Sequence, residues 1–252
     1  MFNETSGDFE LYLMADGFVK VSSGIQRRIL KALQERDMTA TEISEAVGRA
    51  RSTVSVHLEN LEANGMIEYR WNEEDGRSKV FSLISDPLIK SKRPDRKALT
   101  MSKDIVSQSL TYPDSASNLI LRSIILTADG AGLDMAPILF TIGCDFAEAH
   151  RRRITTRSVS KLLDAVKSTF DTFCIGELSV YSKDPITILF RDTVDLTQTS
   201  AEVMASFVSG FLVTIFRNNL GEDYRITDQE VFGDHNNYIR MRFEPESAHS
   251  MP

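Results

Sequence analysis

The stretch that decides the fold is residues 39–65, which read TATEISEAVGRARSTVSVHLENLEANG. Thr39 stands three residues before Glu42, which is the spacing of a capping box at the start of a helix. Gly48 follows the first apolar stripe and predicts the end of that helix. A second apolar stripe at helical spacing runs on to Gly65 and predicts a second helix. Two short helices joined by a few residues that include glycine form the helix-turn-helix pattern.

The residues on either side extend this pattern. Residues 24–35, GIQRRILKALQE, carry apolar residues at helical spacing and predict a preceding helix. Residues 66–71 and 79–84 read as strands around the turn NEEDGRS, which predicts a β-hairpin, or wing, after the second helix. Near the N-terminus, Asp-Gly at 16–17 splits two apolar runs in residues 9–21 and predicts another short hairpin. A helix is the alternative there, which the glycine disfavours.

The segment 24–85 resembles the winged-helix repressors of the ArsR and MarR type. The residues that carry the resemblance are Thr41–Ile43, Ser52–Ser55, His57, Leu58, Leu61, Gly65–Ile67 and the wing residues Asp75, Gly76 and Arg77. The resemblance implies that the second helix of the motif reads DNA and that the wing contacts the duplex beside it.

The DNA contacts are predicted from the chemistry of the outward residues. A recognition helix reads base edges in the major groove, and cations and hydroxyl groups around it bind phosphates. The residues expected to contact DNA are Thr41, Arg49, Arg51, Ser52, Thr53, Ser55, Val56, Arg77 and Lys79. The alternative is that these are ordinary polar faces of a winged helix that docks a protein partner.

The second half of the chain predicts a different kind of domain. Between residues 118 and 173 the apolar pattern predicts three helices, and strands around Lys183-Asp184-Pro185 follow. A long apolar helix is expected over 200–219, and two more strands complete the order. Three helices, two strands, one helix and two strands predict an α+β domain with a four-stranded antiparallel sheet.

This order resembles the 4-vinyl reductase domain, which is related to a fold of vesicle-trafficking (TRAPP complex) subunits. The residues that carry the resemblance are Gly143, Phe170–Gly176, Asp184-Pro185, Phe207–Phe211 and Tyr238–Phe243. The winged helix followed by such a domain looks like the methanogen-specific regulators of that architecture, which are archaeal redox-responsive transcription factors. The resemblance implies a sensor domain that responds to redox state or binds a small apolar effector.

Two sets of residues in this half are candidates for sensing. Cys144 and Cys174 are the only cysteines, so they cannot build a disulfide framework or a structural zinc site. They are candidate redox thiols, with buried small apolar residues as the alternative. The aromatic residues expected to line an effector pocket are Phe140, Phe170, Phe173, Phe207 and Phe211, with a packed core as the alternative.

Four segments are therefore predicted along the chain. Residues 1–88 form the N-terminal hairpin and the winged helix-turn-helix, and residues 89–117 form a linker with a helical stretch. Residues 118–245 form the sensor and dimerisation domain, and residues 246–252 form a disordered tail.

Composition limits the function. The chain has 252 residues, of which 42% are hydrophobic and 26% charged, so a globular protein is expected. The net charge of −7 argues against a generally basic nucleic-acid coat protein. No signal peptide or membrane-spanning run is recognised, which predicts a cytoplasmic protein. None of the common catalytic motifs is present, so no enzyme activity, catalytic residue, cofactor or metal is predicted.

The predicted function is a dimeric regulator that binds operator double-stranded DNA, because paired half-sites are usual for such folds. The second domain would sense a redox or small-molecule signal. The alternative is a protein-interaction module in which the C-terminal half is a scaffold.

Overall fold

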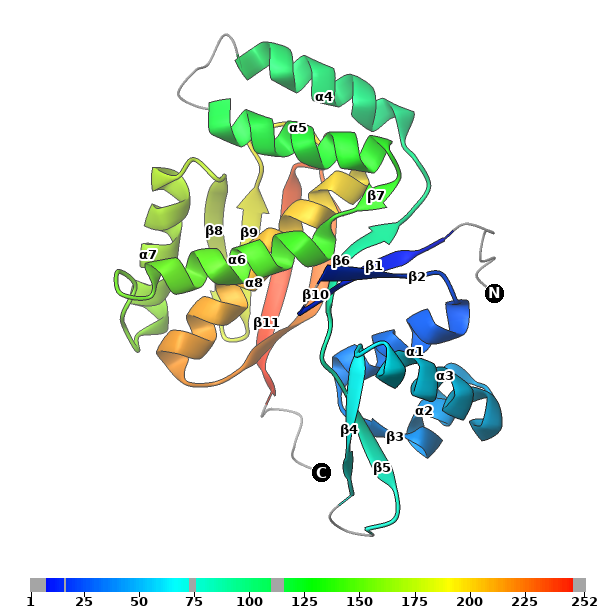
Figure 1. Cartoon of the computed structure of the whole chain (residues 1–252). Helices are drawn as coiled ribbons and strands as arrows, with labels where there is room; N and C mark the ends of the chain where they lie inside the picture. Colours follow the sequence, from blue (N-terminus) through cyan, green and yellow to red (C-terminus); the bar gives the residue numbers. More distant parts are fainter. Residues whose placement is uncertain (1–7, 16, 73–75, 110–115, 247–252) are drawn as a thin grey trace. The chain divides into compact units, whose positions relative to one another are not determined.

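The computed structural model describes residues 8–15, 17–72, 76–109 and 116–246. The chain forms two compact units, Met1–Ser91 and Lys92–Pro252 (Figure 1). The turn residues Asp16 and Asp75 and most of the predicted tail lie outside the described residues.

The first unit contains the winged helix-turn-helix. Its helices are α1 (Gly24–Glu35), α2 (Ala40–Val47) and α3 (Arg51–Ala63). Strands β3 (Met38–Thr39), β5 (Lys79–Leu83) and β4 (Ile67–Trp71) form an antiparallel sheet in that order, and β4 and β5 are the predicted wing. The apolar stripes of the three helices and the inner residues of the wing share one core.

A second group of strands completes this unit. The predicted N-terminal hairpin is present as β1 (Glu10–Met14) and β2 (Gly17–Val21), paired from Glu10↔Val21 to Met14↔Gly17. The other edge of β1 pairs with β6 (Asp86–Ser91), a strand that the sequence did not predict.

The second unit is an α+β domain, as predicted. Its helices are α4 (Arg96–Ser109), α5 (Ala116–Gly130), α6 (Ala136–His150), α7 (Val159–Thr172) and α8 (Gln198–Leu220). Its strands are β7 (Leu133–Asp134), β8 (Glu177–Lys183), β9 (Ile186–Arg191), β10 (Tyr224–Phe232) and β11 (Tyr238–Pro245). The last four form an antiparallel sheet in the order β10-β11-β9-β8.

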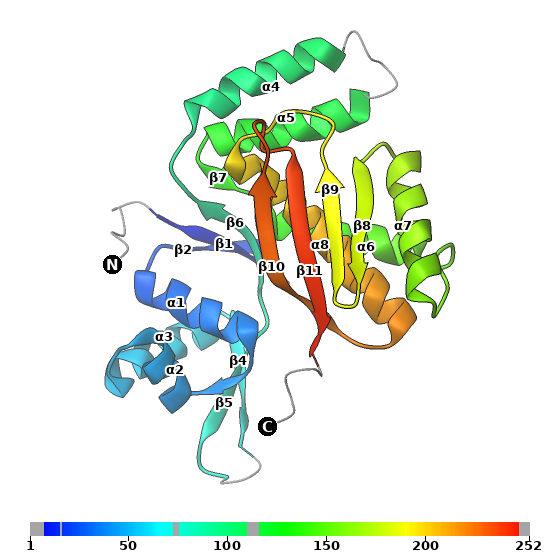
Figure 2. The ribbon, with the colours of Figure 1, turned by 180° about the vertical axis from the view of Figure 1, so that it is seen from behind.

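One face of this sheet is covered by helices (Figure 2). Residues alternate between buried and exposed along β9 and β11, so the inner face joins the core with α8. By length and composition α8 could cross a membrane, but 78% of its most apolar 18-residue stretch is buried inside the structure. It is therefore the central core helix of the domain.

Two glycines let α6 and α8 approach closely. A Cβ atom on Gly143 would overlap the carbonyl oxygen of Phe207, and one on Gly210 would overlap the carbonyl oxygen of Phe140. The mid-helix Gly210 therefore serves backbone contact between the two helices, which offsets its low helix propensity.

The segment 89–117, predicted to be a linker, differs in the structure. Its described part contains the end of β6 and the whole of α4, and α4 buries Ala98 and Ile105 in the core of the second unit. The hydroxyl of Ser102 donates to the carbonyl oxygen of Ser123 on α5 at 3.0 Å. The many Lys, Ser and Pro residues made this region look like a solvated connector, although its few apolar residues fall on one helix face.

Two ion pairs with buried carboxylates connect elements of the second unit. Arg122 on α5 is fully buried and pairs with Asp192, with Nε–Oδ1 and Nη2–Oδ2 distances of 3.2 Å. Asp129, also on α5 and 2% exposed, lies 2.9 Å from the ammonium of Lys92. The same carboxylate accepts hydrogen bonds from Thr197 and Ser200 at the N-terminus of α8. Asp129 thus joins the first residues of the unit to its central helix.

Candidate nucleic-acid interface

The N-terminal half of α3 presents the predicted reading residues to solvent. Arg51, Ser52 and Thr53 are exposed, and Val56 is 64% exposed. Ser55 is half-buried, and its hydroxyl donates to the carbonyl oxygen of Arg51 at 3.0 Å. The opposite face of α3 buries Val54, Leu58 and Leu61, so the helix has one inward and one outward side, as expected for a recognition helix.

The preceding helix supplies two further residues on the surface. Thr41 in the first turn of α2 and Arg49 after its end are both exposed. The capping box is formed, since the Thr39 hydroxyl accepts from the backbone N–H of Glu42 and the Glu42 carboxylate accepts from the backbone N–H of Thr39 at 2.7 Å. These bonds fix the start of α2, where Thr41 lies.

The capping carboxylate is strongly favoured in its charged form. The backbone N–H of Thr39 is the largest cause that lowers the pKa of Glu42 from 4.5 to about 2. Arg36 adds to this shift with a contact of 2.8 Å.

The wing residues lie on the same side as α3 but differ from each other in setting. Arg77 is exposed, whereas Lys79 is half-buried at the start of β5. The ammonium of Lys79 lies 3.5 Å from the centre of the Tyr69 ring, which is a cation–π contact. Lys79 pairs with Trp71 in the β4–β5 register, so it is held at the end of the wing next to its turn.

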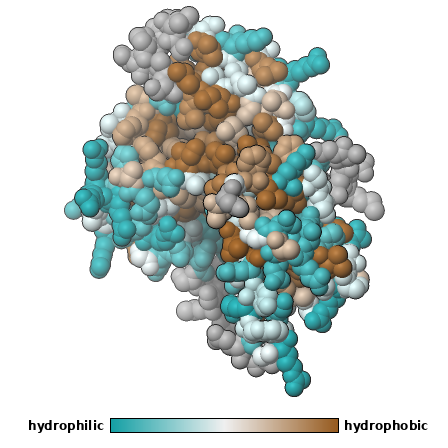
Figure 3. Space-filling model, in the orientation of Figure 1, coloured by the Kyte–Doolittle hydropathy of each residue, from teal (hydrophilic) through white to brown (hydrophobic). Residues whose placement is uncertain are grey.

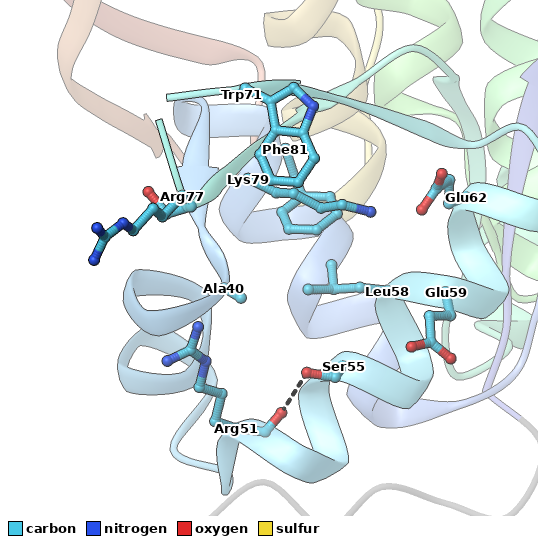
Figure 4. A pocket seen from close by; sticks show the side chains of 11 residues that line it. Ala40, Arg51, Ser55, Leu58, Glu59, Glu62, Trp71, Arg77, Lys79 and Phe81 are labelled. Carbon is cyan, nitrogen blue, oxygen red and sulfur yellow. Dashed lines mark hydrogen bonds between the residues drawn. The ribbon is translucent and has the colours of Figure 1, made fainter. Parts of the chain in front are cut away.

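A groove of about 320 Å³ runs between α3 and the wing (Figure 4). Leu58 and Phe81 are buried beneath it, and Trp71 is 56% exposed beside it. The residues that line it are Ala40, Arg51, Ser55, Leu58, Glu59, Glu62, Trp71, Arg77, Ser78, Lys79 and Phe81. The groove thus brings together four of the predicted DNA-contact residues: Arg51, Ser55, Arg77 and Lys79.

Several lining residues were missed from the sequence. Glu59 and Glu62 continue the face of α3 that begins with Arg51 and Ser55, because residues three or four apart share a helix face. Trp71 also lines the groove, and Tyr69 lies under the ammonium of Lys79; the sequence predicts both only as strand residues of the wing. The i, i+4 spacing on α3 could have placed the glutamates, whereas Tyr69 under Lys79 depends on the β4–β5 register.

A helix-turn-helix with an outward N-terminal half of α3 and a wing beside it is the DNA-binding element of a transcription regulator. Residues 23–69 match the family model described as "Bacterial regulatory protein, arsR family". The match spans α1 through most of β4, and it confirms the ArsR-type helix-turn-helix predicted for this part of the chain. No curated protein matches the chain in sequence.

The two cysteines of the second unit lie in different settings. Both are free thiols. Cys144 is half-buried in α6, where its Sγ lies 3.5 Å from the carbonyl oxygen of Gly210. Cys174 is exposed in the turn after α7, with a positive φ of 51°. Of the two, Cys174 is the more exposed residue.

The five phenylalanines predicted for an effector pocket do not share one environment. Phe170 and Phe211 are fully buried and Phe207 is 6% exposed, whereas Phe140 and Phe173 are about 40% exposed. Phe146, which was not among the five, lies between them, with ring centroids 5.2 to 6.0 Å from those of Phe173, Phe207 and Phe211. The buried members belong to the core cluster of the second unit, so the five differ in environment, and the effector pocket stays a prediction.

Within the described part of the chain, no three His, Cys, Asp or Glu side chains converge as a metal site.

Proposed function

We propose that the protein is a cytoplasmic homodimeric transcription regulator that binds operator DNA through α3 and the wing. The observation that carries the proposal is the ArsR-type helix-turn-helix whose exposed α3 residues and wing cations face one groove. We infer that the second unit is a non-catalytic sensor domain of the 4-vinyl reductase type. Its antiparallel sheet and the Gly143–Gly210 helix contact support this assignment.

The DNA-binding part is tested by substitution on the groove. Arg51→Ala and Arg77→Ala should each weaken binding of a fragment of the protein's own promoter, measured by mobility shift across a salt series. The loss of a phosphate contact should make the negative slope of log K against log salt shallower by about 0.9. Arg28→Ala is the matched control, because Arg28 is an exposed arginine on α1 outside the groove. If Arg51→Ala binds as tightly as the wild type, α3 is not the recognition helix.

The proposed dimer surface is an apolar face on α5 and α6, which we call the α5–α6 surface (Figure 3). It consists of Ile120 and Ile124 on α5 and Phe140 and Ile142 on α6, each 40% to 52% exposed. Between residues 118 and 128 the one charged side chain is Arg122, which is buried against Asp192. Exposed apolar side chains gathered on one face of a protein are typical of an interaction site.

A second copy of the chain is the occupant that we propose for the α5–α6 surface. An uncharged apolar face is complementary to itself across a two-fold axis, since no like charges meet there. A two-fold pair would also present two recognition helices, as paired half-sites require.

We propose that the second unit responds either to thiol oxidation or to a small apolar effector. For the redox response, the exposed Cys174 is the reacting residue: its thiol would be oxidised by hydrogen peroxide to a sulfenic acid, and the peroxide would be reduced to water. Peroxide should then change promoter binding by the wild type, whereas Cys174→Ser should bind like the reduced wild type with or without peroxide. If peroxide does not change promoter binding by the wild type, the redox response is excluded, and the small apolar effector is the signal that remains proposed.

A further inference from the structure

The groove between α3 and the wing carries opposite charges on its two sides. In Figure 4, Arg51 and Arg77 lie on one side, and Glu59 and Glu62 lie together on the other. Along α3 the groove face runs from Arg51 through Ser55 to the two glutamates, so it changes from cationic to acidic within one helix. The carboxylates add to the repulsion of any phosphate that enters the groove.

Lys79 is the third cation that lines the groove, and the contact given for its ammonium is with an aromatic ring. Its stem crosses Phe81, and its ammonium points toward the side that carries the carboxylates (Figure 4). The same ammonium lies over the Tyr69 ring, 3.5 Å from its centre. Lys79 therefore lies at the turn end of the wing, where it pairs with Trp71, and its ammonium contacts an aromatic ring.

We propose that Glu59 and Glu62 limit the affinity of this surface for DNA of arbitrary sequence, and so act as specificity-determining residues. The inference rests on the proposed DNA-binding function. Non-specific binding depends on phosphate contacts and counterion release. Two carboxylates beside the cations weaken that general attraction, whereas contacts to base edges by the N-terminal half of α3 are unaffected. The protein then depends on base contacts for stable binding.

The size of the effect follows from Coulomb's law. A carboxylate about 8 Å from a phosphate in water lowers the binding constant about twofold, and two lower it about fivefold. Salt screens exposed charges over about 10 Å at 0.1 M, so the effect should shrink as salt is raised.

The test is a gain of affinity, which an unfolded protein cannot produce. The full chain with Glu59→Gln and Glu62→Gln should bind a short mixed-sequence duplex about fivefold more tightly than the wild type at low salt. The matched control is Glu35→Gln with Asp86→Asn, because both residues are exposed on the first unit, do not line the groove and change the net charge equally. The control should bind within about twofold of the wild type.

The outcomes separate this inference from the proposed function. A gain that equals the control's would overturn the inference, because net charge alone would explain it. If Arg51→Ala weakens binding but the glutamate variant binds like the wild type, only the role of the glutamates is lost. If neither variant alters duplex binding, the assignment of the groove to DNA is lost as well.

Discussion

At the start of α2, the Glu42 carboxylate accepts hydrogen bonds from the backbone N–H and the hydroxyl of Thr39 at 2.7 and 2.8 Å. Both bonds favour the ionised carboxylate, which is why the pKa of Glu42 falls to about 2. A single side chain thus connects proton binding to the geometry of the helix that presents Thr41.

We expect this carboxylate to make the stability of the first unit depend on acid pH. A pKa that is depressed in the folded state contributes stability above the ordinary value of 4.5, and that stability is lost as pH falls toward about 2. The difference in unfolding free energy between the wild type and Glu42→Gln should therefore be largest at neutral pH and shrink below about pH 4.5. Chemical denaturation followed by circular dichroism at a series of pH values measures it. A difference that is constant from pH 7 to pH 3 would contradict the charged capping box.

At the scale of elements, the close contact between α6 and α8 depends on two glycines, which have no side chain. Gly143 and Gly210 each face a backbone carbonyl of the other helix. A methyl group at either position would force the helices apart along a contact between two rigid backbones.

Gly210→Ala should therefore destabilise the second unit by about 1–3 kcal/mol, the usual cost of overpacking a core. An ordinary mid-helix Gly→Ala change stabilises by about 1 kcal/mol, so the sign of the effect distinguishes the two cases. Denaturant titration of the full chain gives the value. A stabilised Gly210→Ala protein would show that the close approach is not required.

Most elements were predictable because their apolar residues follow one period. Short stretches of sequence were enough to predict the capping box at Thr39, the two wing strands and the end of α2 at Gly48. The helical stretch that became α4 was predicted, but its packing into the second unit was not, because its contact with α5 includes buried hydroxyl groups such as Ser102, which hydrophobic periodicity cannot detect. Strand β6 contains a proline and was missed because its pairing with β1 links distant parts of the chain.

The candidate site was predictable to the same extent. The exposed residues of α3 follow from helical spacing, whereas the Tyr69–Lys79 contact needs the strand register. The different environments of the five phenylalanines could not be predicted: aromatic residues at helical spacing mark an apolar face, but the pattern does not say whether that face closes on a core or opens on a cavity.

At the scale of the whole molecule, the proposed dimer gives a prediction for the α5–α6 surface. Ile120→Glu with Ile124→Glu should yield a monomer in sedimentation, because buried carboxylates would face each other across the two-fold axis. Both side chains are about half exposed, so the fold should tolerate the change. Promoter binding should weaken by about tenfold or more, since two linked half-sites bind together.

Val180→Glu serves as the matched control for the dimer, because Val180 is a partly exposed apolar residue on β8 outside the α5–α6 surface. It should leave the sedimentation of the protein unchanged. If the wild type itself sediments as a monomer at the concentrations at which it binds DNA, the α5–α6 surface is not a dimer interface.

The ion pair between Lys92 and Asp129 limits where the two halves of the chain can be separated. The compact units divide after Ser91, yet the first residue beyond that division supplies the cation for a carboxylate that is 2% exposed. A fragment that begins at Arg93 would contain every helix of the second unit, α4 to α8. It would leave the Asp129 carboxylate buried without its cation, which is costly for a buried charge. Cleavage after Lys92 instead of after Ser91 would thus weaken the N-terminus of α8, which lies more than a hundred residues further along the chain.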